Sequence, residues 1–310
     1  MPKKTLLELV NTAQAELGLT QSSTDIGNTD PPTVQMLALL NLELDELRKE
    51  QQQGWTALQT EFNLSVIPPV AITGTINTDS DLITAITGTL TTVEAQFWVA
   101  LANGLPSSGG ACRVILTSAT ATTIQLNMLA IASDTGVSVL LAKDTYDLPS
   151  DFDRYIGNTW WDRTHYWALF GPDSPQLDQL HRSGIFTTGP RRHFRQIGPY
   201  ANRYRIWPAP AEITEPIQLV FEYVSNTPVI TGSDLEPATI VKKQYFTVDT
   251  DTCLLDDRAL IMGLKWRFWA QKGLNWVPLA TQYKNYVEIL KARDGGNTTK
   301  SLVKNPSSYL

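Results

Sequence analysis

Residues 146–163 decide how this chain folds, and they read Tyr-Asp-Leu-Pro-Ser-Asp-Phe-Asp-Arg-Tyr-Ile-Gly-Asn-Thr-Trp-Trp-Asp-Arg. The segment opens as a turn, because Pro149 disfavours a helical backbone at Leu148 and the side chain of Ser150 can bond nearby amides. It then becomes strongly apolar, which predicts a buried hub where two halves of one domain meet. The residues that carry this prediction are Phe152, Tyr155, Ile156, Trp160 and Trp161, interleaved with Asp151, Asp153, Arg154, Asp162 and Arg163.

The composition is that of a globular protein with a weakly charged surface. The chain has 310 residues, 42% of them hydrophobic and 18% charged, which is enough for one large domain or two. Nine tryptophans indicate either a Trp-rich core or a permanent interface between proteins, and the sequence leaves both open.

Net charge and hydropathy exclude several function classes. A formal charge of −6 argues against a protein that grips nucleic acid over its whole face, because phosphate binding needs lysine and arginine. No stretch is apolar enough to predict a membrane anchor or a signal peptide, so we expect a soluble protein made in the cytoplasm. Cys112 and Cys253 lack metal-ligand spacing and are expected to be small buried hydrophobes.

Helical periodicity marks both ends of the chain. We expect helices over about 3–17 with Gly18 as its C-terminal cap, from Pro31 and Pro32 to about 49, and from Trp55 to about Phe62. Two more are expected near the C-terminus, over about 257–272 and 278–290.

The amino-acid composition changes at Val66. Residues 66–141 are rich in Thr, Ser, Ile, Val and Gly in short alternating runs, and the segment Ala-Ile-Thr-Gly-Thr at 71–75 repeats at 85–89. This pattern predicts a small all-β module inserted into a host domain formed by 1–65 and 142–293, with 294–310 as an extended C-terminal tail.

In the middle of the host domain apolar and polar residues alternate, as they do in β-strands. Strands are expected over 166–170, 194–197, 204–207 and 217–224, with a helix from Ser174 and Pro175 to about Arg182. The fold expected is therefore α+β: a helical bundle of the N-terminal helices and a C-terminal helical hairpin, an antiparallel β meander, and the inserted all-β domain.

Catalytic, cofactor and metal sites are not indicated. Asp147, Asp151, Asp153 and Asp162 are read as turn formers and arginine partners, since nothing marks one of them as a general acid. The histidines, His165, His181 and His193, lie on separate predicted elements without helix-face spacing, so we expect no metal and no cofactor.

One basic cluster stands out, with Arg191, Arg192 and Arg195 at its centre and Arg203 and Arg205 following. Arginine binds phosphates and also carboxylates across protein interfaces, and the acidic remainder of the chain favours the second. Arg191, Arg192 and Arg195, with Trp207, are therefore our candidates for contacts across a protein interface.

Short blocks spread over the chain resemble the head-to-tail adaptor proteins of short-tailed bacteriophages. They are Thr5–Val10, Ala15–Leu19, Val34–Asn41, Tyr146–Phe152, Trp161–Arg163, Gly171–Pro172, Gly189–Arg192, Ile206–Pro210, Phe221–Ser225 and Gly263–Arg267. The likeness covers the host domain. Residues 66–141 depart from the adaptor pattern and look like β modules that decorate various phage virion proteins.

The resemblance implies a structural virion protein at the head-to-tail junction. Its subunits would form a homo-oligomeric ring, twelve being the expected number, that joins the portal protein to the tail nozzle protein, with tail fibres as further partners. Packaged DNA would pass through the lumen without sequence-specific binding. In such rings a C-terminal segment often docks on the portal, and here it would use Leu302, Val303, Tyr309 and Leu310. Contacts between subunits or with the tail nozzle would use the interface candidates Arg191, Arg192, Arg195 and Trp207.

Two other functions remain open at this point. A tail-associated cell-wall hydrolase or carbohydrate-binding component would use the β insert for binding and Asp151 and Asp153 for chemistry. A DNA-gripping protein would use Arg191, Arg192 and Arg195 and would show steeply salt-dependent affinity.

Overall fold

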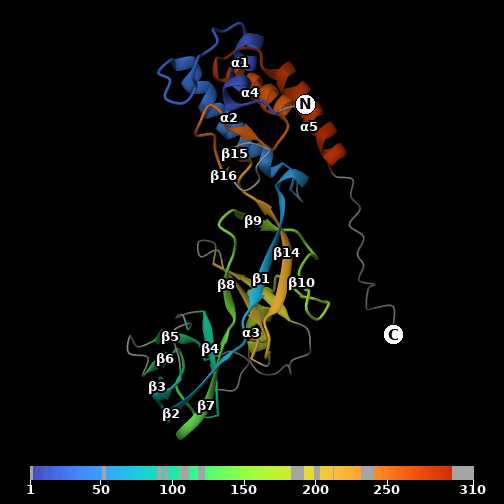
Figure 1. The fold of residues 1–310 in the computed structure, drawn as a ribbon. Helices are drawn as coiled ribbons and strands as arrows, with labels where there is room; N and C mark the ends of the chain where they lie inside the picture. Colours follow the sequence, from blue (N-terminus) through green and yellow to red (C-terminus); the bar gives the residue numbers. More distant parts are fainter. Residues whose placement is uncertain are drawn as a thin grey trace, which may run out of the picture. The chain divides into compact units, whose positions relative to one another are not determined.

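The computed structural model describes residues 3–50, 54–88, 93, 97–103, 105, 112–117, 123–182, 192–198, 203–211, 213–231 and 241–294. The chain divides into two compact units (Figure 1). The first, which we call the helical unit, comprises Met1–Thr60 and Val224–Leu310; the second, the strand unit, comprises Glu61–Tyr223.

Four helices pack together in the helical unit: α1 (Leu6–Leu17), α2 (Pro31–Lys49), α4 (Asp257–Gln271) and α5 (Val277–Asp294). The first helix begins in a capping box in which the Thr5 and Glu8 side chains bond each other's backbone amides, and it ends at Gly18. Gly18 has φ of 72°, the left-handed conformation expected of a C-terminal cap. The predicted entry of α2 at Pro31 and Pro32 is also confirmed.

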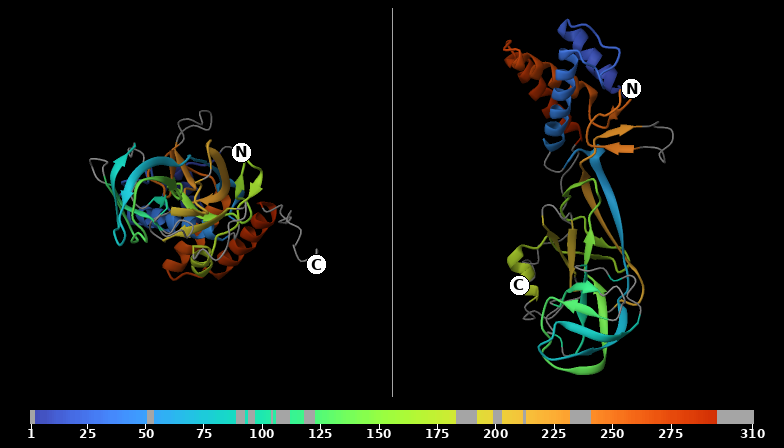
Figure 2. Two further views of the ribbon diagram at one scale, coloured as in Figure 1. Left: turned by 90° about the horizontal axis from the view of Figure 1, so that it is seen from below. Right: turned by 90° about the vertical axis from the view of Figure 1, so that its left-hand side faces the viewer.

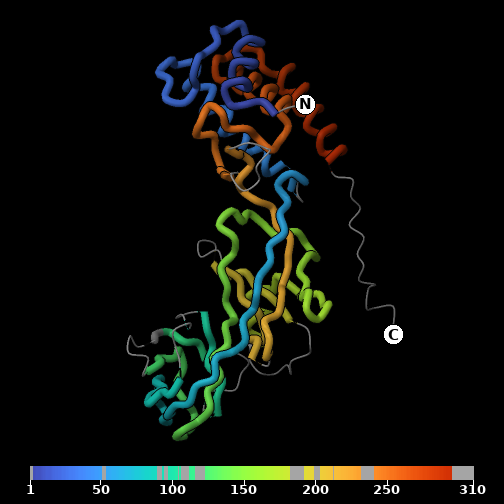
Figure 3. Tube along the Cα trace, in the orientation of Figure 1, coloured from blue at the N-terminus to red at the C-terminus, as the bar shows by residue number. Residues whose placement is uncertain are grey.

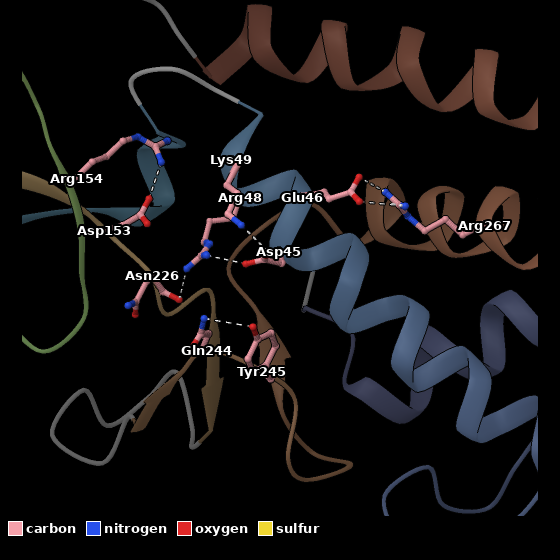
Figure 4. A network of polar contacts seen from close by, with 10 residues as sticks. All are labelled: Asp45, Glu46, Arg48, Lys49, Asp153, Arg154, Asn226, Gln244, Tyr245 and Arg267. Atoms are coloured by element: carbon pink, nitrogen blue, oxygen red, sulfur yellow. Dashed lines mark hydrogen bonds and ion pairs between the residues drawn. The ribbon is translucent and has the colours of Figure 1, made fainter. Parts of the chain in front are cut away.

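The closest approach of α2 and α4 depends on a glycine. Gly263 lies on α4 where a Cβ atom would overlap the side chain of Glu43 on α2. The absent side chain lets Glu43 reach Arg267, whose Nε donates to Glu43 Oε2 at 2.6 Å and whose Nη2 donates to Glu46 Oε2 at 2.6 Å. Figure 4 shows Arg267 extended toward Glu46, with Arg48 turned to Asp45 and the Asn226 carbonyl.

A small sheet completes the helical unit. Its strand order is β16 (Val241–Lys243), β15 (Val229–Thr231) and β17 (Thr252–Cys253). An antiparallel bridge between Thr5 and Thr252 links the sheet to the start of α1. From sequence, residues 227–243 read as an irregular segment, and the strands β15 and β16 correct that reading.

Two sheets of the strand unit enclose an aromatic core. The first has the order β1 (Gln59–Val66), β14 (Ile217–Ser225), β10 (Trp161–Asp162) and β11 (Trp167–Ala168), with β9 (Phe152–Tyr155) also paired to β14. The second has the order β12 (His193–Ile197), β13 (Arg203–Trp207) and β8 (Thr145–Asp147). The tube in Figure 3 shows β1 running beside β14, far apart in sequence.

The remaining sheet is six-stranded, with the order β4 (Trp98–Leu101), β7 (Asp134–Lys143), β2 (Val70–Ile76), β3 (Leu82–Thr87), β6 (Ile124–Leu126) and β5 (Val114–Thr117). A bridge from Val99 to Arg113 brings its two edges together, so the sheet curls into a nearly closed barrel (Figure 2). Its apolar side chains form a core of their own around Ile83, Trp98 and Val139. The repeated Ala-Ile-Thr-Gly-Thr segments fall on or beside β2 and β3, which pair with each other.

The expectation of a fold built mainly on a helical bundle was wrong. The described residues hold five α-helices, α3 (Pro175–Arg182) being the fifth, beside a strand-rich body of several antiparallel sheets, and the fold is mixed α/β. One cause is the segment 55–62, which we had expected to be helical. It forms a single 3-10 turn, η1 (Thr56–Leu58), and then β1, because Phe62, Leu64 and Val66 alternate with polar residues and pack on the aromatic core.

Candidate interaction surface

The hairpin of β10 and β11 presents aromatic side chains to solvent. Its turn is held by the buried carboxylate of Asp162: Oδ1 accepts from the amides of Thr164 at 2.9 Å and His165 at 3.0 Å, and Oδ2 contacts His165 Nδ1 at 2.8 Å. Three bonds to one buried carboxylate fix the turn, so the hairpin is a rigid feature.

Around this turn Trp161 is 38% exposed, Trp167 46% and Tyr166 82%. The His165 ring stacks on Trp167 with ring centroids 5.5 Å apart. Aromatic side chains with large exposed area and few rotatable bonds are enriched where proteins bind one another. We call Trp161, His165, Tyr166 and Trp167 the aromatic hairpin.

Two pockets share Asp162 in their lining. One, of about 370 Å³, is lined by Trp161 and Tyr166 together with Glu61 and Glu222. The other, of about 440 Å³, is lined by His165 and Trp167 together with Arg192 and Glu215. Apolar rings beside carboxylates and a guanidinium give each pocket an apolar wall and a polar rim, the make-up of a protein-binding surface.

The structure places three of our contact candidates within the strand unit. Arg192 Nη1 donates to the Pro208 carbonyl at 3.1 Å, and Arg195 Nη1 pairs with Asp178 on α3 at 2.6 Å. Trp207 is 7% exposed and stacks on the His181 ring, with centroids 4.7 Å apart. Arg192 lines a pocket, whereas Arg195 and Trp207 are engaged in the packing of α3 on β12 and β13.

The other candidates fall elsewhere. Arg191 and the portal-docking candidates Leu302, Val303, Tyr309 and Leu310 lie outside the described residues. Their assigned roles stay predictions.

The aspartates near the hub bond to neighbouring side chains. Asp151 accepts from the Tyr223 hydroxyl at 2.8 Å, Asp153 pairs with Arg154 at 2.6 Å, and Asp147 accepts from Arg203 Nε at 3.1 Å. Burial, together with the hydrogen bond and charge of Asp151, raises the pKa of Tyr223 above its ordinary value. These pairings favour structural roles for the three carboxylates.

The histidines are arranged differently from what the sequence suggested. His165 belongs to the aromatic hairpin, but His181 and His193 come together against Asp173, a residue we had not singled out. The spacing of 173, 181 and 193 matches no motif that we sought, because β12 returns beside Phe170 and makes them neighbours only in the folded chain.

No protein-family model and no curated protein matches the chain. Within the described part of the chain, none of the helices combines the length and the apolar character that crossing a membrane requires.

Proposed function

We propose that this protein is a structural subunit of the virion of a short-tailed bacteriophage, in the adaptor ring between the portal and the tail nozzle. Its work is assembly: each copy binds its neighbours, extends the DNA channel and attaches the tail after packaging. The proposal uses no catalytic residue and no cofactor. Its first support is the series of sequence blocks that resemble such adaptors, from Thr5–Val10 to Gly263–Arg267.

The structural observation that carries the proposal is the aromatic hairpin. In a closed ring each subunit offers one patch that binds a different patch on its neighbour. Exposed aromatic side chains are enriched in such patches. Trp161, Tyr166 and Trp167 supply such a surface, and the Asp162 bonds hold it in place without the partner. A surface that is already ordered loses little conformational entropy on binding.

The charge of the chain supports the proposed relation to DNA. With a formal net charge of −6, the protein lacks the excess of lysine and arginine that phosphate binding needs. A ring of such subunits lets packaged DNA pass through its lumen without sequence-specific binding. Attachment to the portal is assigned to residues 297–310, and tail fibres are further proposed partners.

The test is ring assembly on purified portal particles, observed by negative-stain electron microscopy. We expect the full chain to add a ring, twelve subunits being expected, and the double variant Trp161→Ala/Trp167→Ala to add none. A central interface tryptophan contributes about 2 kcal/mol or more, which is roughly a 30-fold loss of affinity for each.

The matched control removes similar apolar area elsewhere. Leu129→Ala/Ile131→Ala takes away two side chains that are 56% and 66% exposed and should assemble normally. A chain that lacks Asn297–Leu310 should keep its fold and lose portal attachment. Normal rings from the tryptophan variant would remove the hairpin from the proposal. Peptidoglycan cleavage by the full chain that Asp151→Asn abolishes would replace the adaptor with the hydrolase.

A further inference from the structure

Three side chains from separate elements converge in the strand unit. Asp173 precedes α3, His181 lies in the last turn of α3, and His193 begins β12. Asp173 Oδ2 lies 3.2 Å from His181 Nδ1, and Asp173 Oδ1 lies 3.3 Å from His193 Nδ1. One ligand atom from each of the three residues lies within 4.8 Å of the other two. The imidazole rings stand at 60° with centroids 4.5 Å apart.

The backbone brings Asp173 and His193 together. Phe170 forms a parallel bridge with His193, and the Asp173 amide donates to the Phe194 carbonyl at 2.9 Å. Both residues therefore belong to one hydrogen-bonded framework, and their side chains need little rearrangement to share a ligand.

The helix that carries His181 is fastened to the same framework. Its first turn is capped by Ser174, whose Oγ accepts from the Leu177 amide at 3.2 Å. Asp178 then pairs with Arg195 of β12 at 2.6 Å. His181 follows Asp178 by three residues, so both side chains are on the same face of α3. Its ring stacks on Trp207, which fixes its orientation.

The spacing separates this cluster from an ordinary hydrogen-bonded pair. The strand unit contains such a pair, in which His165 Nδ1 lies 2.8 Å from Asp162 Oδ2. Charge-assisted hydrogen bonds of this type measure about 2.7–2.9 Å, so 3.2 and 3.3 Å are long. The two contacts use different oxygens of Asp173, and one ligand atom from each residue lies within 4.8 Å of the other two. Ligands at about 2.0–2.1 Å from a shared tetrahedral ion stand about 3.3–3.4 Å apart, so a small adjustment of the side chains brings the three atoms around one ion.

The ligand types narrow the choice of ion. Two imidazole nitrogens and one carboxylate suit zinc and its neighbours in the first transition row, whereas calcium and magnesium prefer sites made of oxygen. The side chains of Asp173 and His181 are 7% and 11% exposed and that of His193 is 25% exposed, so the cluster is sheltered but open on one side. Water can complete the coordination there.

We propose that Asp173, His181 and His193 bind a divalent transition-metal ion, zinc being the expected one, and that this ion fastens α3 to β12. The role is structural, since the ion joins the short helix α3 to β12, an edge strand of its sheet. The inference is independent of the adaptor function.

The experiment uses the full chain without a histidine tag, stripped with EDTA and titrated with Zn²⁺ in a calorimeter. We expect one ion per chain, and the Co²⁺ form should show the visible absorption of low-coordinate cobalt with nitrogen ligands. Replacing outer-shell partners of a metal site already weakens affinity about 10–100-fold, so His181→Gln and His193→Gln should each weaken it by at least about 100-fold.

The control is His165→Gln, which removes the histidine that pairs with Asp162 in the same unit. This variant should leave the affinity for Zn²⁺ unchanged. Zinc should raise the melting temperature of the full chain and of this control, but not of the two ligand variants.

Circular dichroism of every protein in EDTA shows whether each variant folds. If a histidine variant does not fold, Asp173→Asn, in which the new side chain is similar in size, replaces it as the ligand variant. The proposal is overturned if the full chain takes up no stoichiometric ion, or if His165→Gln weakens binding as much as the ligand variants. Either result would leave Asp173 with one long hydrogen bond to His193 and a close contact with His181.

Discussion

The aromatic core of the strand unit and the α2–α4 contact of the helical unit are both buried, but different forces define them. In the first, Trp160 is stacked between Phe194 and Phe221, with ring centroids 4.1 and 4.0 Å away. In the second, Glu43 is fully buried and is paired with Arg267. The aromatic core depends on volume and shape, whereas the helix contact depends on two opposite charges that must both be present.

The largest effect is expected at the aromatic core. Trp160→Ala removes a 2% exposed side chain and both stacked contacts, and should cost near the upper end of about 3–5 kcal/mol of unfolding free energy. Urea unfolding followed by circular dichroism measures it. The adjacent Trp161→Ala is the matched control: since 38% of that residue is exposed, its cost should be clearly smaller than that of Trp160→Ala. Equal costs for the two variants would contradict this account of the core.

Breaking the charge pair should have the next largest effect. Arg267→Leu leaves Glu43 buried without its cation and should cost about 3 kcal/mol. Burial already raises the pKa of Glu43, although Tyr283 and Arg267 act to lower it. Without Arg267 the pKa should rise further.

The sign of the pH dependence follows from that shift. A carboxyl with a raised folded-state pKa binds more protons when folded than when unfolded, so stability falls as pH rises from the ordinary glutamate pKa through the raised value. The cost of Arg267→Leu should therefore shrink in acid. The double variant Glu43→Gln/Arg267→Leu should recover much of the loss at neutral pH. A double variant as unstable as Arg267→Leu would show that packing, not charge, dominates this contact.

Local signals in the sequence predicted the parts of the fold that depend on neighbouring residues. Gly18, the Pro31 entry and the Ser174 cap were found in this way, because each acts within one turn of its own helix. Strands β12, β13 and β14 were found from alternation. The prediction of a helix over 55–62 failed, because one short apolar run suits a helix turn or a strand equally well. Only the pairing of this segment with β14 makes it a strand.

The sequence predicted the candidate sites less well than it predicted the fold. Trp160 and Trp161 are the same residue type in adjacent positions, and only their places on β10 and in the core make one structural and the other exposed. The cluster of Asp173, His181 and His193 exists because β12 lies beside Phe170. Sequence motifs based on residue spacing do not predict this long-range contact.

The smallest of the three effects should come from Asp251, a buried carboxylate in the helical unit that is paired with hydrogen-bond donors as well as with a cation. It accepts from the Thr231 hydroxyl and from the amides of Thr247 and Val248 at 2.8 and 2.9 Å, and pairs with Lys243 at 3.0 Å. Burial acts to raise its pKa, but these bonds prevail and hold it below the ordinary value.

Asp251→Asn presents an N–H group to these donors and should cost about 2 kcal/mol at neutral pH, since hydrogen bonds to charged groups contribute about 1.5–3 kcal/mol. A carboxyl with a lowered folded-state pKa stabilises the fold above its ordinary pKa, and the contribution is lost as pH falls through the lowered value. The gap between the parent chain and Asp251→Asn should therefore narrow in acid, as for Arg267→Leu, but at lower pH. Asp147→Asn, at an exposed ion pair, is the control and should show no comparable cost. A gap that stays constant with pH would mean that the cost comes from the N–H group facing these donors and not from the lost charge, which would separate Asp251 from Glu43.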